Sequence, residues 1–303
     1  MSIFKAKIGL ALGGGAAKGI AHVGVLKALQ DKEVEVDFIA GTSAGAIAAS
    51  LYAFRLDLET IDQLARRLTF SKVTNFKLAK TGFFSTDSLK KLILEQIGPV
   101  NIEDASIPLA IVTTDIKTGE VVTLTRGPLA DAVCASTAIP GIYIPVNIEG
   151  RLLVDGGLLQ NVPIQALTQM GADFTIASHI HSVNSQSEPS HALDIIRNAF
   201  EIAINQHTRN QLRTANLLIA MDLSDFSLRD NTERYDELFL IGYESASRQL
   251  NKLSWYRKNK IFLYSARVLN QLLPFKVPEV LKRPVSSTNS SSNSGTPLST
   301  EDI

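Results

Sequence analysis

Residues 39–50 read IAGTSAGAIAAS, and this stretch organises the rest of the chain. A short apolar strand at 38–40 runs into a Gly-x-Ser-x-Gly turn, and a helix of small residues follows. This order is typical of a nucleophile elbow, a tight turn that exposes a serine at the start of a helix. A side chain at Gly41 or Gly45 would collide with neighbouring backbone in such a turn. Ser43 is therefore a candidate nucleophile, and its alternative role is that of a helix N-cap.

The composition limits what the chain can be. Its 303 residues allow one large α/β domain or two small ones, and 45% of them are apolar. The 30 basic residues balance the 30 acidic residues, so the overall charge does not indicate nucleic acid as a partner. The single cysteine, Cys134, excludes an internal disulfide and offers no metal cluster.

The sequence contains no apolar stretch long enough for a signal peptide or a membrane span. We therefore expect a cytoplasmic protein, soluble or peripheral at a membrane, and export by a signal-independent route stays open. Residues 252–285 indicate one way to contact a membrane, because their basic side chains are interleaved with aromatic and leucine residues. Such a segment is typical of an interfacial anchor, and an amphipathic helix packed on the core is the alternative.

A glycine-rich loop follows the first predicted strand, at 7–12, and leads into a helix predicted at 20–29. The loop reads GGGAAKG over residues 13–19, a general anion-binding arrangement between a strand and a helix N-terminus. A Walker loop needs Lys and then Ser or Thr after its last glycine, whereas Lys18 precedes Gly19. A dinucleotide fingerprint would need a third glycine where Lys18 stands. We interpret the loop as a set of backbone donors to an oxyanion, with Lys18 adding a positive field.

Asp155 directly follows the apolar residues of a strand predicted at 151–154, and two glycines, Gly156 and Gly157, come next. A carboxylate at a strand end lies where α/β folds place their chemistry. The glycines let other backbone approach closely. A plain Asp-Gly turn is the alternative interpretation.

Histidines offer a second catalytic possibility. With Ser43 and Asp155, either His179 or His181 of the loop after the strand predicted at 174–177 would complete a Ser-Asp-His triad in the order of the α/β-hydrolases. His22 lies among apolar helix residues and is interpreted as a core histidine instead. The histidines of the predicted polar loop are His179, His181 and His191.

Periodicity predicts the remaining elements, except over residues 70–84, where no clean period holds. We interpret that segment as a loop with exposed aromatic residues or a mobile cap over the site. Further strands are predicted at 36–40, 108–114, 120–125, 144–148 and 217–220, and further helices at 44–54, 58–68, 89–97, 129–138, 163–170, 193–214 and 233–250.

Four motifs now stand in one order, and together they resemble the patatin-like phospholipases, in particular the bacterial and neuropathy-target-esterase branch. The resemblance is strong because of the order, since each motif alone is weak. It covers residues 7–170 convincingly. The motifs are Gly13–Leu29, Gly41–Gly45, Ala135–Gly141 and Asp155–Gly157.

The resemblance implies a three-layer α/β/α fold with a mainly parallel central sheet. We expect the patatin-like catalytic core over residues 7–170, and helices and a strand that complete the same domain over 171–251. The basic-aromatic extension would occupy 252–285. A disordered Ser-rich tail would follow over 286–303.

The resemblance also implies a Ser-Asp dyad, with Ser43 as the nucleophile and Asp155 as the base. The loop amides of Gly14, Gly15 and Ala16 would form the oxyanion hole. Many relatives have a third glycine and an arginine where this chain has Ala16 and Lys18, and neither change argues against activity. The supporting motif residues would be Lys18, Gly19, Gly41, Gly45, Gly156 and Gly157.

The function implied is that of a lipid acyl hydrolase, of phospholipase A or lysophospholipase type, that needs no metal and no cofactor. Its substrate would be a phospholipid or another fatty acyl ester, and it would have no nucleic acid partner. Two alternatives stay open: an esterase with the Ser-Asp-His triad, and a non-catalytic adaptor or regulator built on the same fold.

Overall fold

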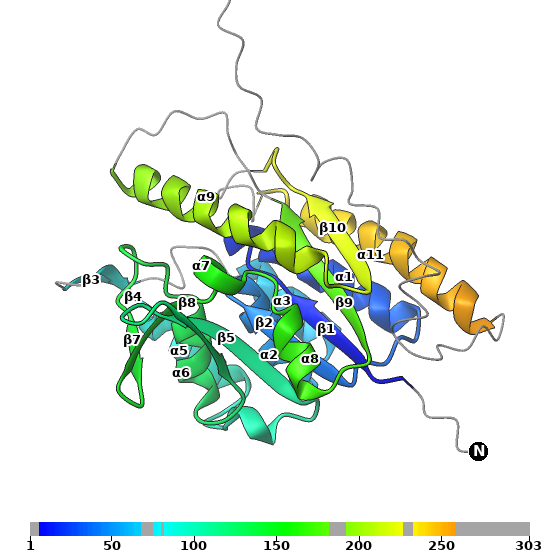
Figure 1. The fold of residues 1–303 in the computed structure, drawn as a ribbon, viewed down its shortest axis with the longest axis horizontal. Helices are drawn as coiled ribbons and strands as arrows, with labels where there is room; N and C mark the ends of the chain where they lie inside the picture. Colours follow the sequence, from blue (N-terminus) through cyan, green and yellow to red (C-terminus); the bar gives the residue numbers. More distant parts are fainter. Residues whose placement is uncertain (1–5, 68–74, 80–81, 182–191, 227–232, 259–303) are drawn as a thin grey trace, which may run out of the picture.

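The computed structural model describes residues 6–67, 75–79, 82–181, 192–226 and 233–258. An eight-stranded sheet runs through its centre in the order β10-β9-β1-β2-β5-β8-β7, with β6 paired to β5 (Figure 1). The first five strands of this order are mutually parallel, and β6, β7 and β8 pair antiparallel. The strands are β1 (Ile8–Leu12), β2 (Phe38–Thr42), β5 (Leu109–Asp115), β6 (Glu120–Leu124), β7 (Val146–Ile148), β8 (Arg151–Asp155), β9 (Phe174–His181) and β10 (Leu217–Asp222).

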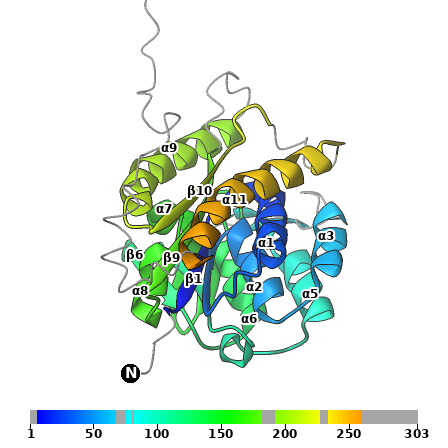
Figure 2. The same cartoon turned by 90° about the vertical axis from the view of Figure 1, so that its right-hand side faces the viewer.

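Helices cover both faces of the sheet, so the expected three-layer α/β/α arrangement with a mainly parallel sheet is confirmed (Figure 2). One face carries α7 (Gly157–Gln160), α8 (Ile164–Met170) and α9 (Ala192–Leu212). The other face carries α1 (Ala21–Asp31), α2 (Ala44–Ala53), α3 (Leu58–Arg67), α5 (Asp87–Gln96), α6 (Leu129–Ser136) and α11 (Tyr235–Lys258). Two short 3-10 turns, η1 (Ala16–Ile20) and η2 (Ile102–Asp104), complete the described helices.

The apolar core is divided between the two faces of the sheet. All five residues of β1 are buried, and Leu10 and Leu12 pack in the larger cluster, under α1 and α2. Ala11, between them, packs in the smaller cluster with side chains of α8. A strand covered on both faces reads as a continuous apolar run, which is why the sequence pattern predicted β1 well.

Helices α1 and α11 touch backbone to backbone. A Cβ on Gly24 would lie 2.1 Å from the carbonyl oxygen of Phe239, and a Cβ on Gly242 would lie 2.0 Å from that of Ala21. Neither position accepts a side chain, because the obstructing atoms belong to the backbone of the other helix. These two glycines therefore allow α11 to pack closely against α1. Helix α1 is the helix that follows the glycine-rich loop.

Two strands replace part of the loop expected at 70–84. β3 (Asn75–Ala79) and β4 (Gly82–Ser85) pair antiparallel. Phe84 then exchanges backbone hydrogen bonds with the segment before β7, donating to Ile142 (3.0 Å) and accepting from Ile144 (2.9 Å). Pairing with residues far along the chain does not depend on a local side-chain period, so periodicity did not reveal it. The prediction of a loop over 75–79 and 82–84 was wrong.

The prediction of a polar loop after 174–177 was also wrong for the first two histidines placed in it, His179 and His181. β9 continues to His181, because its last residues pair with β10, His179 beside Ala220 and His181 beside Asp222. His191 lies outside the described residues, as does the chain beyond 258. The short helix α7 was not predicted. No helix among the described residues is long and apolar enough to cross a membrane.

Candidate active site

The elbow joins β2 to α2 at Ser43. This residue has φ 55° and ψ −124°, a positive φ that is costly for a residue with a side chain. The steric demand expected at the flanking glycines is present. A Cβ on Gly41 would lie 2.4 Å from the carbonyl oxygen of Gly45, and a Cβ on Gly45 would lie 2.1 Å from that of Leu12.

Strands β2 and β8 lie along the same edge of β5. Residues 109–112 of β5 pair with β2, and residues 113–115 pair with β8. β6 pairs with residues 111–115, which overlaps both segments, so β6 must occupy the opposite edge. Because β2 is parallel to β5 and β8 is antiparallel to it, the two strands run toward each other along their shared edge.

The carboxyl ends of these two strands therefore meet. Thr42, the last residue of β2, pairs with Val112. Asp155, the last residue of β8, pairs with the next residue, Thr113. Ser43 follows Thr42 directly, so the topology brings the two candidate catalytic residues together from positions 112 residues apart in the chain.

The Ser43 hydroxyl lies close enough to the Asp155 carboxyl to act on it as a hydrogen-bond donor. Asp155 is 2% exposed and Ser43 8% exposed, and Asp155 Oδ1 also accepts the backbone N–H of Gly157 at 2.7 Å. Burial raises the pKa of Asp155 to about 6, against the lowering effect of these two hydrogen bonds. The carboxyl is thus a stronger base than an exposed aspartate and is still mostly ionised at neutral pH.

Ser136, from the motif before β7, holds the elbow in place. The backbone N–H of Ser43 donates to Ser136 Oγ at 2.9 Å, and Ser136 Oγ donates to the carbonyl oxygen of Val112 at 2.7 Å. The backbone amide of Ser43 is therefore already occupied. Sequence reasoning noted the motif but gave Ser136 no role, since its partners, at the elbow and in β5, lie far from it in the sequence.

The glycine-rich loop lies against Ser43. A Cβ on Gly14 would come within 3.3 Å of Ser43 Cβ. The N–H of Gly14 is not free for an oxyanion, because it donates to both Asn161 O and Asn161 Oδ1, each at 3.1 Å. The amides of Gly15 and Ala16 have no hydrogen-bond partner in the part of the chain that the structure describes. The candidate oxyanion hole is thereby narrowed to these two amides.

Other motif residues support the shape of the site. A Cβ on Gly19 would lie 2.5 Å from Ala44 Cβ, and a Cβ on Gly156 would lie 2.3 Å from the carbonyl oxygen of Val112. Lys18 is buried, and its Nζ donates to the carbonyl oxygen of Leu223 at 2.9 Å. Lys18 therefore ties the loop to the segment after β10.

Asn161 is a residue that sequence reasoning missed. It follows α7 and is 4% exposed. Gln211 of α9 fixes the same segment, because its Nε2 donates to Leu159 O at 2.7 Å and its Oε1 accepts from Val162 N at 3.1 Å. The only sequence signal was a pair of amides, Gln160 and Asn161, between apolar residues shortly after the Asp-Gly-Gly motif.

The histidines do not join this site within the described residues. His22 is fully buried, with Nδ1 2.9 Å from Ser178 Oγ and Nε2 2.8 Å from Gly13 O. Burial lowers the pKa of His22 to about 4, so it is the neutral core histidine that the sequence indicates. His179 is buried with Nδ1 unpartnered, and neither it nor His181 is hydrogen-bonded to Ser43 or Asp155. The described residues do not assemble a Ser-Asp-His triad.

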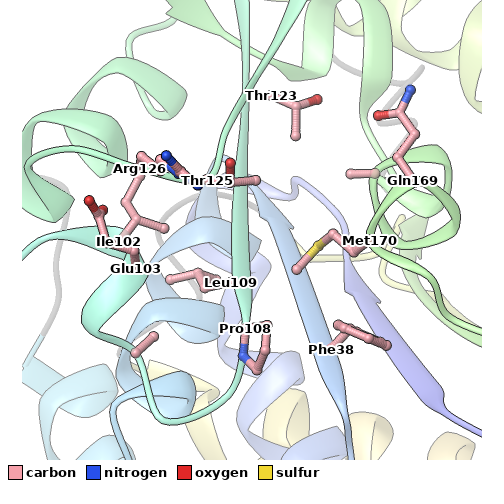
Figure 3. A pocket seen from close by; sticks show the side chains of 12 residues that line it. Phe38, Ile102, Glu103, Pro108, Leu109, Thr123, Thr125, Arg126, Gln169 and Met170 are labelled. Atoms are coloured by element: carbon pink, nitrogen blue, oxygen red, sulfur yellow. The ribbon is translucent and has the colours of Figure 1, made fainter.

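A separate cavity of about 600 Å³ lies near the beginnings of β2 and β5, the ends opposite to the elbow (Figure 3). Phe38, Leu109 and Met170 supply apolar lining, and Arg126 and Gln169 supply polar groups. Neither Ser43 nor Asp155 lines it. The cavity is therefore distinct from the candidate active site.

The arrangement of loop, elbow and Asp-Gly-Gly turn has counterparts in known proteins. The family model of the patatin-like phospholipases matches residues 10–168, just over half of the chain. The chain belongs to the patatin-like phospholipase family. Ser43, Asp155, Asn161 and the glycine-rich loop all lie within the matched patatin-like residues.

Curated relatives narrow the branch. An uncharacterised NTE family protein of Mycobacterium tuberculosis is 34% identical over 222 residues, which are 72% of this chain and 60% of the relative. The neuropathy target esterase of Drosophila melanogaster is 35% identical over 183 residues, 58% of this chain and 13% of the relative. The lysophospholipase of Yarrowia lipolytica is 31% identical over 183 residues, with the same coverage. The chain thus spans about three fifths of its mycobacterial relatives and a small part of the longer ones.

Solved structures share the fold. VipD from Legionella pneumophila superimposes with a TM-score of 0.56 at 16% identity, covering 82% of this chain and 67% of VipD. The type III effector protein ExoU superimposes with a TM-score of 0.52 at 15% identity, covering 82% of this chain and 54% of ExoU. At these identities the likeness supports the patatin-like fold and nothing finer.

Proposed function

We propose that this patatin-like chain is a serine lipid acyl hydrolase that cleaves fatty acyl esters through Ser43 and Asp155. The observation that carries the proposal is the meeting of Ser43, at a strained elbow, with the buried carboxyl of Asp155 where β2 and β8 end. A serine hydroxyl is a weak nucleophile unless a base takes its proton as it attacks. Asp155 is the ionisable group hydrogen-bonded to Ser43 among the described residues.

The reaction has two halves. In the first, Ser43 Oγ bonds to the ester carbonyl carbon while its proton passes to Asp155. The carbon–oxygen bond to the leaving group then breaks, and that oxygen takes the proton from Asp155, which leaves an acyl-enzyme. In the second, water replaces the alcohol, Asp155 takes a proton from it, and the fatty acid leaves as the proton returns to Ser43.

The developing oxyanion needs hydrogen-bond donors fixed before the reaction. The amides of Gly15 and Ala16 are the candidates, because the amides of Ser43 and Gly14 already donate within the fold. Removing one such donor typically costs about 3–4 kcal/mol of transition-state stabilisation. The φ of 48° at Ala16 is a strained conformation retained in this loop, and it orients the peptide units on either side of that residue.

Glycerophospholipids and lysophospholipids are the proposed substrates. The relatives named neuropathy target esterase and lysophospholipase support this class. Contact with a membrane surface is part of the proposal, since such substrates reside in membranes. Its sequence support, the basic-aromatic stretch 252–285, lies almost wholly outside the described residues.

The test is hydrolysis of a short-chain ester and of a mixed-acyl phosphatidylcholine by wild type, Ser43→Ala, Asp155→Asn and a His179→Ala/His181→Ala double variant. We expect the first two variants to lose at least a thousandfold in kcat/KM and the double variant, if it folds, to keep its activity. A folded double variant without activity would favour a triad. A wild type inert on every ester, vesicles included, would favour a binding protein.

A further inference from the structure

Asn161 lies between the glycine-rich loop and the base. The N–H of Gly14 makes a three-centre hydrogen bond to Asn161 O and Oδ1, both at 3.1 Å. A Cβ placed on Gly157 would lie 3.0 Å from Asp155 Oδ1 and 3.4 Å from Asn161 Oδ1. The two side-chain oxygens therefore lie within 3.4 Å of one common point, so Asn161 adjoins Asp155 as well as the loop.

At the start of the loop, the backbone amides of Gly13 and Gly14 are fixed by hydrogen bonds to other elements, and Lys18 ties down its far end. Gly13 donates its N–H to Ser178 O at 3.0 Å and accepts from His22 Nε2 at 2.8 Å, which attaches the loop to β9. Asn161 holds the next residue, Gly14. The following two amides, of Gly15 and Ala16, are the ones left for an oxyanion. Their direction depends on the peptide that Asn161 holds.

Asn161 is itself anchored from two sides. The short helix α7 separates Asn161 from Asp155 in the chain. A displacement of Asp155 is therefore transmitted to Asn161 through that helix. Gln211 hydrogen-bonds Leu159, two residues before Asn161, and Val162, the residue after it, and thus fixes this segment to α9. Asn161 is therefore a rigid link between the base and the oxyanion donors. It is not part of a flexible loop that would adjust to the position of either.

We propose that Asn161 is a positioning residue that occupies the Gly14 amide and aims the Gly15 and Ala16 amides at the ester oxygen. The inference rests on the proposed function. An amide fits this task better than a carboxylate, because it accepts from Gly14 without placing a negative charge beside Asp155 and the developing oxyanion.

Two substitutions separate positioning from stability. Asn161→Ala removes the side-chain acceptor, and we expect kcat on a dissolved short-chain ester to fall at least 30-fold while KM changes less than threefold. Asn161→Asp keeps the acceptor but adds a charge near Asp155. We expect it to move the acid limb of the kcat/KM profile to higher pH by at least one unit, because a like charge raises the pKa of Asp155.

Asn216 provides the matched control. Its Oδ1 accepts the backbone N–H of Thr175 at 2.8 Å, at the end of the sheet remote from the elbow. Asn216→Ala removes the same kind of contact, and Asn216→Asp adds a charge to it. We expect neither variant to change kcat by more than twofold, and neither to shift the acid limb of the kcat/KM profile by more than 0.3 pH unit. Thermal melting of all four variants shows which are folded.

Three results would count against the proposal. Folded Asn161→Ala with kcat within threefold of wild type would overturn it, and so would Asn161→Asp with an unmoved acid limb. Equal effects from the Asn216 variants would reduce Asn161 to a structural role. A wild type without hydrolysis would instead contradict the proposed function, and this inference with it.

Discussion

The carboxyl of Asp155 has a raised pKa because burial removes it from water, and this effect outweighs the two hydrogen-bond donors that the described residues give it, Ser43 and Gly157. A base with a pKa of about 6 must lose its proton before it can accept one from Ser43. We expect kcat/KM on a dissolved ester to fall about tenfold per pH unit below pH 6. An exposed aspartate would place this acid limb near pH 4.

The measurement is a kcat/KM profile from pH 4.5 to 8 on a short-chain ester. The His179→Ala/His181→Ala variant is the control, and its limb should coincide with that of wild type if it is folded. A limb that disappears or shifts in this variant would assign the titration to a histidine and not to Asp155.

The same pKa has a consequence for stability. The folded chain holds the Asp155 proton up to a pH of about 6, whereas an unfolded chain releases it near 3.8. Folding stability therefore decreases as the pH rises through this window, and the full penalty, on the order of 3 kcal/mol, is present above it. We expect Asp155→Asn to raise the free energy of unfolding at pH 7.5 and to raise it little at pH 4. Urea denaturation at both values tests this, and an equal change at both would contradict it.

At the scale of elements, the site depends on α6 as much as on the elbow. Ser136 at the end of α6 accepts from the Ser43 amide and donates to Val112 of β5. Ser136→Ala leaves a buried N–H without its acceptor, so we expect a loss of about 1–3 kcal/mol in the free energy of unfolding. Urea denaturation measures it.

Ser50→Ala is the control for that loss. Ser50 Oγ donates to Ala46 O at 2.7 Å inside α2, and Ala46 O is an acceptor within its own helix. Removing this hydroxyl leaves no backbone donor unpaired, and we expect a loss of about 1 kcal/mol or less. Comparable losses in the two variants would show that Ser136 has no special part in holding the elbow.

The sequence predicts the local features of this structure better than its non-local contacts. β1, β2 and the glycines of the elbow were predictable, because buried strands and tight turns require particular residues in consecutive positions. The three-centre bond of Asn161 was not, since its partner Gly14 lies at the other end of the family core. The end-to-end meeting of β2 and β8 depends on strand register, which a side-chain period does not specify.

At the scale of the whole molecule, the last described helix, α11, packs against α1, near the other end of the chain. Gly242 allows this contact, because a Cβ there would lie 2.0 Å from Ala21 O. Gly242→Ala must push the two helices apart, and we expect it to lower the free energy of unfolding by about 2–3 kcal/mol. Gly150→Ala is the control: its φ is 80° and nothing lies within 4 Å, so only about 1 kcal/mol of backbone strain is expected. A Gly242→Ala variant as stable as the control would contradict this view of the contact.

The central claim is that Ser43 reacts covalently with the acyl group and that Asp155 takes its proton. The most direct measurement is labelling of the full chain by a fluorophosphonate, a reagent that reacts with activated serines, followed by mass spectrometry of the digested protein. The account predicts one adduct, on the peptide that contains Ser43. It should be absent in Ser43→Ala and at least a hundredfold slower in Asp155→Asn. An adduct on another residue, or equal labelling of Asp155→Asn and wild type, would contradict the account.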